Sequence, residues 1–247
     1  MGKPLRIRPF SVIYEDDDMI AVNKASGIPS VTDRWDSSKR GLNALLAEVL
    51  RKRIFIVHRI DADTSGAVVF AKNPAAHRRL SMAFESRSAG KLYTAVVLGK
   101  PEWTETSCAA PLVPNGDKRH RTIIDKYRGK KSLTRFRLLH SAAGLSVVAA
   151  APESGRTHQI RVHLASMGHP IVCDTLYGRG APLFLSSFKR TWRGDRHDER
   201  PLIGRLALHA QKLKIPARGG GELCFEAPYP KDMAAVIGQI EKLSRRF

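Results

Sequence analysis

The sequence predicts an α+β fold in which helices flank a mixed, mostly antiparallel sheet. Apolar runs of strand type are joined by short turns, as in residues 11–24 and 132–152, and the helical patterns do not alternate regularly with them. Strands joined by short turns pair antiparallel, whereas parallel strands need long crossovers. No internal repeat or linker divides the 247 residues, so we expect one domain over 1–247, with its core at about 11–245.

The N-terminal half carries signals for a hairpin, two helices and three further strands. Residues 11–24 place an acidic turn between two apolar runs, which predicts the hairpin. In residues 41–53 apolar side chains recur at helical spacing and cations follow them, which predicts a helix. Pro74 begins a second helical pattern, residues 74–88. Clusters of β-branched and aromatic residues predict strands at 54–57, 67–71 and 91–99.

In the C-terminal half, residues 155–171 fit two periods. Alternation would give a strand, but Ile160, Leu164 and Met167 also share one helical face. Thr157 as a cap and Gly168 just past the end favour the helix. The remaining expectations are strands at 132–140 and 145–152, a helix at 231–247, and irregular, basic stretches at 100–131 and 185–205.

Charge is the first indication of function. Lys and Arg number 42 against 23 acidic residues, a net charge of +19, and such an excess is typical of proteins that bind a polyanion. The cations are spread along the chain and no apolar run is long enough to span a bilayer, so we expect no membrane role. Cys108, Cys173 and Cys224 lie far apart, which argues against disulfides and indicates a reducing, cytoplasmic setting.

The segment HRIDADTSG, residues 58–66, resembles half of a calcium-binding loop. Counted from Asp61, the position that requires a bidentate glutamate is occupied by Lys72, and the flanks are strand-like. His158 and His163 are five apart and do not form the helical zinc pair. We therefore expect no metal, and histidines that are buried and hydrogen-bonded, or that stack on or contact RNA.

By itself Asp61 is most simply a turn-forming residue, but two other segments also carry a chemically useful residue. Tyr93 lies in KLYTAVVLG and Arg161 in GRTHQIRVHLA. In this order the three segments resemble the signature motifs of the RluA-type pseudouridine synthase family. Ile60 replaces the usual leucine of the first motif, and weaker likeness covers most of the chain. Only about ten residues precede the first expected strand, so the family's separate N-terminal RNA-binding domain is not expected.

The resemblance implies a pseudouridine-synthase-like catalytic domain that isomerises uridine in structured ribosomal or transfer RNA, without a cofactor. Asp61 matches the catalytic carboxylate, Arg161 the arginine that pairs with it, and Tyr93 the tyrosine that stacks on the target base. A nearby arginine favours an ionised nucleophile, and a base must leave its helix to be reached. The basic residues of the motifs expected to contact RNA are His58, Arg59, Lys91, Arg156 and His158.

Two departures from the family pattern and one rival function accompany this interpretation. Ala25 stands where the family commonly has proline, and Cys173 stands where glycine is usual before Asp174. The rival is a non-catalytic RNA-binding or assembly module with the same fold, which predicts loss of the catalytic residues. We expect a monomer whose own basic loops, 119–131 and 189–205, contact RNA.

Overall fold

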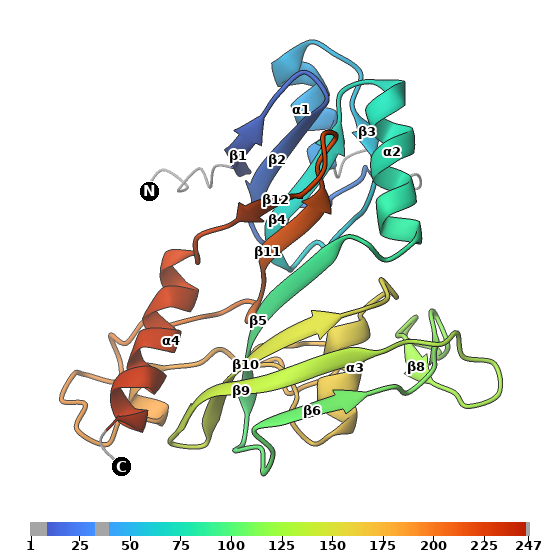
Figure 1. Cartoon of the computed structure of the whole chain (residues 1–247). Helices are drawn as coiled ribbons and strands as arrows, with labels where there is room; N and C mark the ends of the chain where they lie inside the picture. Colours follow the sequence, from blue (N-terminus) through green and yellow to red (C-terminus); the bar gives the residue numbers. More distant parts are fainter. Residues whose placement is uncertain (1–8, 33–39, 246–247) are drawn as a thin grey trace. The chain divides into compact units, whose positions relative to one another are not determined.

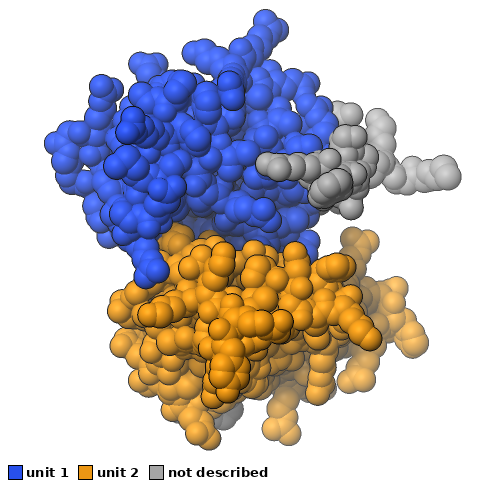
Figure 2. Space-filling view, turned by 90° about the vertical axis from the view of Figure 1, so that its right-hand side faces the viewer, with its two compact units in different colours: residues 1–90, 210–228 blue, residues 91–209, 229–247 orange. Residues whose placement is uncertain are grey.

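The computed structural model describes residues 9–32 and 40–245, which fall into two compact units (Figure 2). Unit 1 comprises residues 1–90 and 210–228, and unit 2 comprises residues 91–209 and 229–247. The predicted fold class is confirmed, because antiparallel strand pairs and helices make up both units (Figure 1). That all of 1–247 acts as one domain stays a prediction. Within the described ranges, no helix is both long and apolar enough to cross a membrane.

Unit 1 is a sheet with two helices. Its elements are β1 (Phe10–Glu15), β2 (Met19–Lys24), α1 (Leu42–Leu50), β3 (Phe55–Ile56), β4 (Ser65–Ala71), α2 (Pro74–Glu85), most of β11 (Leu208–Pro216) and β12 (Glu222–Glu226). The strands follow the order β1-β2-β4-β11-β12, and β3 pairs with the C-terminal end of β4. All of β4 is buried, and α2 packs against β3 and β4. Pro74 begins α2 as predicted, and the side chain of Asn73 caps it.

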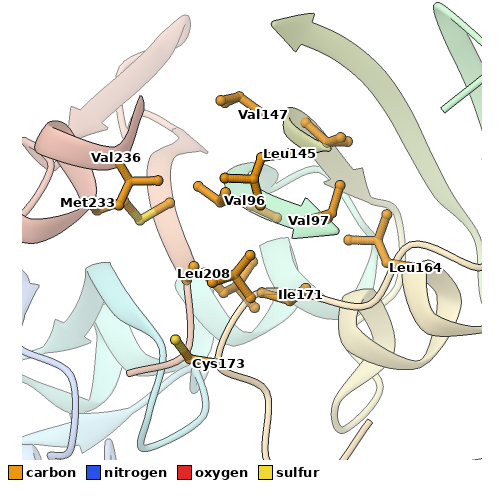
Figure 3. Close-up of a cluster of buried hydrophobic side chains, with 14 of the residues drawn as sticks. Val96, Val97, Leu145, Val147, Leu164, Ile171, Cys173, Leu208, Met233 and Val236 are labelled. Carbon is orange, nitrogen blue, oxygen red and sulfur yellow. The ribbon is translucent and has the colours of Figure 1, made fainter. Parts of the chain in front are cut away.

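Unit 2 is built around a second set of antiparallel strands. Its elements are β5 (Gly90–Leu98), β6 (Glu105–Cys108), β7 (Leu112–Val113), β8 (Ile123–Ile124), β9 (Thr134–Ala142), β10 (Leu145–Pro152), α3 (Gln159–Ser166), the 3₁₀ turn η1 (Leu185–Ser187) and α4 (Lys231–Ser244). The order is β5-β10-β9-β6, and β7 and β8 form a small hairpin of their own. The core shown in Figure 3 joins side chains of β5, β10, α3 and α4.

The structure differs from the sequence prediction in four details, and the end of one predicted helix is not described. The stretch 100–131, expected to be irregular, contains β6, β7 and β8, and neither β11 nor β12 was predicted. His158, not Thr157, occupies the N-cap position of α3, and its side chain makes no capping hydrogen bond. In α1 the predicted apolar stripe is only partly buried, since Val49 is 66% exposed. The last two residues of the predicted C-terminal helix lie outside the described ranges.

Candidate active site

Asp61 lies in the loop between β3 and β4 of unit 1 and is partly buried. The N–H of Thr64 donates to the carbonyl of Asp61 at 3.1 Å, which closes a tight turn. Gly66, in β4, has φ +119°, and a Cβ there would lie 2.2 Å from the carbonyl oxygen of Ala210. Only glycine fits this approach. The glycine that ends HRIDADTSG therefore lets β4 lie against β11 and fixes one end of the loop.

Lys24, at the end of β2, fixes the backbone of the Asp61 turn. It is fully buried, and its ammonium donates to the carbonyls of Ala25 at 3.0 Å, Ile28 at 2.6 Å and Ala62 at 2.8 Å. A buried charge is tolerated only where its donors are satisfied. Because Ala62 directly follows Asp61, one of these bonds holds the turn that carries the carboxylate.

The rest of the segment 24–30 also lines the turn. Gly27 N–H donates to the carbonyl of Ala62 at 2.9 Å, and the Ser26 hydroxyl donates to the carbonyl of Asp63 at 2.6 Å. Ala25, which stands where the family commonly has proline, donates its N–H to the carbonyl of Pro9 at 3.0 Å. Proline has no N–H to donate. The departure therefore adds a bond rather than disturbing the turn.

We expect Lys24→Met to destabilise the protein by about 2–4 kcal/mol, because three carbonyls lose their donor in a buried position. Urea unfolding followed by circular dichroism measures the loss. Lys52→Met is the matched control, since Lys52 is exposed just after α1, and it should change the free energy of unfolding by less than about 0.5 kcal/mol. Equal stability of the two variants would show that Lys24 does not hold the turn.

Two residues expected to contact RNA, His58 and Arg59, precede Asp61 in the same loop. The His58 Nε2 accepts the N–H of Val69 at 3.0 Å, and its ring stacks on Phe84 with centroids 4.3 Å apart. This ring therefore connects the loop to β4 and α2. Arg59 is exposed, so its side chain is available to a ligand in solution.

In unit 2, Arg161 forms a buried, bidentate ion pair with Asp174. Nε and Nη2 of the arginine each lie 2.8 Å from a carboxylate oxygen, and the side chains are 3% and 0% exposed. Burial alone would raise the pKa of Asp174. The hydrogen bond and charge of Arg161, with the N–H groups of Leu176 and Tyr177, outweigh it and lower that pKa. The pair is therefore ionised, and it fixes the guanidinium in one orientation. That Arg161 pairs with Asp61 concerns residues of different units and stays a prediction.

Tyr177 connects this ion pair to the start of α3. Its ring lies 5.2 Å from the Arg161 guanidinium, a cation–π contact. Its hydroxyl accepts the N–H of Thr122 at 2.8 Å and lies 2.9 Å from Nδ1 of His158. Burial raises the pKa of Tyr177, so its hydroxyl keeps a proton to share with His158. His158 has a left-handed backbone, with φ 53°, at the turn into α3.

Gln159 organises the polar residues around the start of α3. Its Oε1 accepts from the Ser154 hydroxyl at 2.8 Å and from the Arg156 N–H at 3.1 Å, and its Nε2 donates to the carbonyl of Leu133 at 3.0 Å. Lys91 donates to the carbonyl of Ser154 at 3.1 Å. Within unit 2, Lys91 and Arg156 therefore belong to the contacts around Gln159, whereas His158 and Arg161 belong to those of Tyr177.

Tyr93 lies in β5 opposite Ala150 of β10. It is partly buried and packs against the core of unit 2. The strand therefore fixes the position of the Tyr93 backbone, and the residue opposite it is a small alanine. A partly exposed ring on a rigid strand suits a stacking role.

Cys173 and His163 show how the third motif is supported. Cys173 has φ +60°, a left-handed conformation that favours glycine, which explains why the family usually has glycine there. The Cys173 side chain is buried, and burial raises the pKa of its thiol.

His163 is also buried and lies between Thr134, Ser132 and Ala110, and burial lowers its pKa. In the described part of the chain, no three His, Cys, Asp or Glu side chains are grouped to hold a metal.

A family model described as RNA pseudouridylate synthase matches residues 18–166, more than half of the chain. The chain belongs to this family. It is 36% identical over 223 residues to an RNA pseudouridine synthase of Zymomonas mobilis, covering 89% of this chain and 94% of that protein. It is 34% identical to ribosomal large subunit pseudouridine synthase D of Nitrosomonas europaea, covering 95% of this chain and 66% of that protein. The human RNA pseudouridylate synthase domain containing 1 has a TM-score of 0.70 at 27% identity, with 100% and 98% coverage.

Family membership confirms the resemblance seen in the three sequence motifs. The structure adds roles for three residues to which the sequence analysis gave none: Lys24, Gln159 and Asp174. Lys24 is detectable in sequence as a cation that closes the apolar run MIAVNK. Asp174 is thirteen positions from Arg161, and no periodicity links the two. The pair can be recognised only once the turn after α3 is folded.

Proposed function

We propose that the protein converts uridine to pseudouridine in RNA, with Asp61 as the catalytic carboxylate. The glycosidic N1–C1′ bond of the uridine breaks, a C5–C1′ bond forms, C5 releases its proton to solvent, and N1 takes up a proton. The carboxylate attacks either the sugar or the base. Arg161, oriented by Asp174, favours its charged form, and Tyr93 stacks on the flipped base. The observation that carries the proposal is the family match over 18–166, which includes all three residues.

The substrate we propose is ribosomal or transfer RNA, and the names of the relatives favour the large-subunit ribosomal RNA. We further propose that the protein acts as a cytoplasmic monomer, with no cofactor. The test is to incubate the purified protein with large-subunit ribosomal RNA and with transfer RNA that lack pseudouridine, and then to map the modified positions. Absence of pseudouridine in every RNA offered, while a characterised synthase modifies the same RNA, would contradict the proposal.

We expect RNA affinity to fall steeply with salt. The net charge of +19 implies that several phosphates are neutralised on binding, and each releases condensed counterions. Between roughly 50 and 200 mM salt, the dissociation constant should rise by tenfold or more. Fluorescence anisotropy with labelled RNA at a series of salt concentrations gives the slope. A flat response would show that the cationic surface does not contact phosphates.

A further inference from the structure

The β7–β8 hairpin of unit 2 ends in a turn built by Asp125. Its Oδ1 accepts the N–H groups of Tyr127 and Arg128, both at 2.9 Å, and its Oδ2 accepts Nε of Arg128 at 2.7 Å. The N–H of Gly129 closes the turn on the carbonyl of Asp125 at 2.9 Å. The hydrogen bonds from Arg128, backbone first, lower the pKa of Asp125. This turn is therefore held by four hydrogen bonds within five residues.

The ordered turn presents an aromatic side chain to solvent. Tyr127 is 98% exposed, more than any other large apolar side chain in the described ranges. Its ring buries almost nothing, so it does not stabilise the fold through burial. The backbone beside it is nevertheless fixed by Asp125. A rigid backbone that carries a free aromatic face is the arrangement on which an unpaired base stacks.

Exposed cations surround this ring in sequence. Of the seven Lys and Arg side chains between 118 and 131, Arg121 forms an ion pair with Asp117 and Arg128 forms one with Asp125. The other five form no ion pair with a carboxylate of the described residues. They are Lys118, Arg119, Lys126, Lys130 and Lys131. Phosphates on either side of a stacked base would meet cations here.

The hairpin is attached to the same part of unit 2 that holds Arg161. Arg121 donates to the carbonyl of Leu176 at 3.1 Å, and Thr122 donates its N–H to the hydroxyl of Tyr177 at 2.8 Å. The ring of Tyr177 in turn contacts the guanidinium of Arg161. The hairpin that carries Tyr127 is therefore linked, through Tyr177, to the residues around Arg161.

We propose that Tyr127 stacks on an unpaired base of the RNA, distinct from the target uridine, while neighbouring lysines neutralise its phosphates. The inference rests on the proposed function in taking RNA as the substrate. Base–aromatic stacking is tolerant of sequence and absent from paired RNA, whose bases are already stacked. Tyr127 thus confers a preference for a single-stranded segment next to the modified site.

The test compares a short single-stranded RNA of mixed sequence with the duplex of the same sequence, by fluorescence anisotropy. Tyr127→Ala should weaken binding of the single strand about tenfold and leave binding of the duplex unchanged. Tyr127→Trp should restore full affinity, because stacking needs the ring and not the hydroxyl. Lys126→Ala should weaken both ligands and lower the salt slope by about one. Val49→Ala, which removes an exposed apolar side chain in unit 1, should change neither.

An unchanged single-strand affinity in Tyr127→Ala, or an equal loss for strand and duplex, would overturn the proposal. Thermal unfolding shows whether the variant is folded, and we expect no shift because the side chain is exposed. The binding result is separate from the proposed function. If the wild-type protein modifies no RNA but Tyr127→Ala still loses affinity only for the single strand, the isomerase assignment is wrong. The proposal that Tyr127 stacks on an unpaired base is then still supported.

Discussion

Asp61→Asn should abolish pseudouridine formation while RNA affinity changes little. Asparagine keeps the shape of the side chain but cannot act as a carboxylate nucleophile. The loss in rate should be at least roughly 10³-fold, the scale on which removal of a nucleophile acts. The turn itself is held by backbone groups of residues 61–64 and by Lys24, and none of these bonds uses the Asp61 carboxylate. The variant should therefore fold normally.

The measurement is release of the C5 proton from uridine labelled at that position, together with anisotropy for binding. Asp63→Asn is the matched control, since Asp63 is exposed in the same turn and its carbonyl, not its carboxylate, accepts the hydroxyl of Ser26. It should keep activity within about twofold, an effect of the size usual for an exposed surface substitution. Full activity in Asp61→Asn would mean that another group does the chemistry. The rival assembly module predicts that neither variant, nor the wild-type protein, releases the proton.

Much of the fold could be predicted because local patterns and tertiary demands agree. Strands such as β4 and β10 are runs of small or β-branched apolar residues, and α4 buries Met233, Val236 and Ile240 as its period predicts. The strands that were missed lack such a pattern. β6 is the polar sequence ETSC, and it is a strand only because β9 pairs with it. β11 mixes lysines with apolar residues, and it is a strand because it pairs with β4 and β12.

In the candidate site too, some residues could be predicted from the sequence and others could not. Residues that act on substrate lie in motifs, so the resemblance located Asp61, Tyr93 and Arg161 directly. Residues that position them do so through backbone carbonyls or across long sequence separations. Lys24 reaches Ala62, thirty-eight positions away, through a carbonyl that any residue would supply. No pattern in the sequence of either segment encodes such a bond.

Asp174→Ala should destabilise the protein by about 3–5 kcal/mol and abolish activity. The Arg161 side chain is 3% exposed, so the variant removes a bidentate carboxylate partner from a buried charge. Asp232→Ala is the control, because Asp232 binds Arg205 in the same bidentate manner with both side chains partly exposed. Solvent screens that pair, and its loss should cost about 1 kcal/mol or less. An equal loss of unfolding free energy in Asp174→Ala and Asp232→Ala would show that burial does not make the Arg161 pair more important for stability.

A double variant, Arg161→Met with Asp174→Leu, separates stability from chemistry. Replacing both charges by apolar groups of similar volume should recover most of the lost stability. Activity should remain absent, because no guanidinium is left to favour the charged form of Asp61. If the double variant regained activity, the arginine would have only a structural role.

The pH dependence of stability gives an independent test of the same ion pair. The pKa of Asp174 is lowered in the folded protein, so the unfolded state takes up this proton first as the pH falls. Its stabilisation is therefore complete above the ordinary carboxyl value near 4 and is lost as the pH falls through the lower, folded value. Urea unfolding across this range should show the wild-type protein losing stability more steeply than Asp174→Asn, which carries no proton-binding group there. Parallel curves would mean that the carboxylate titrates alike in both states, contrary to a buried, ionised pair with Arg161.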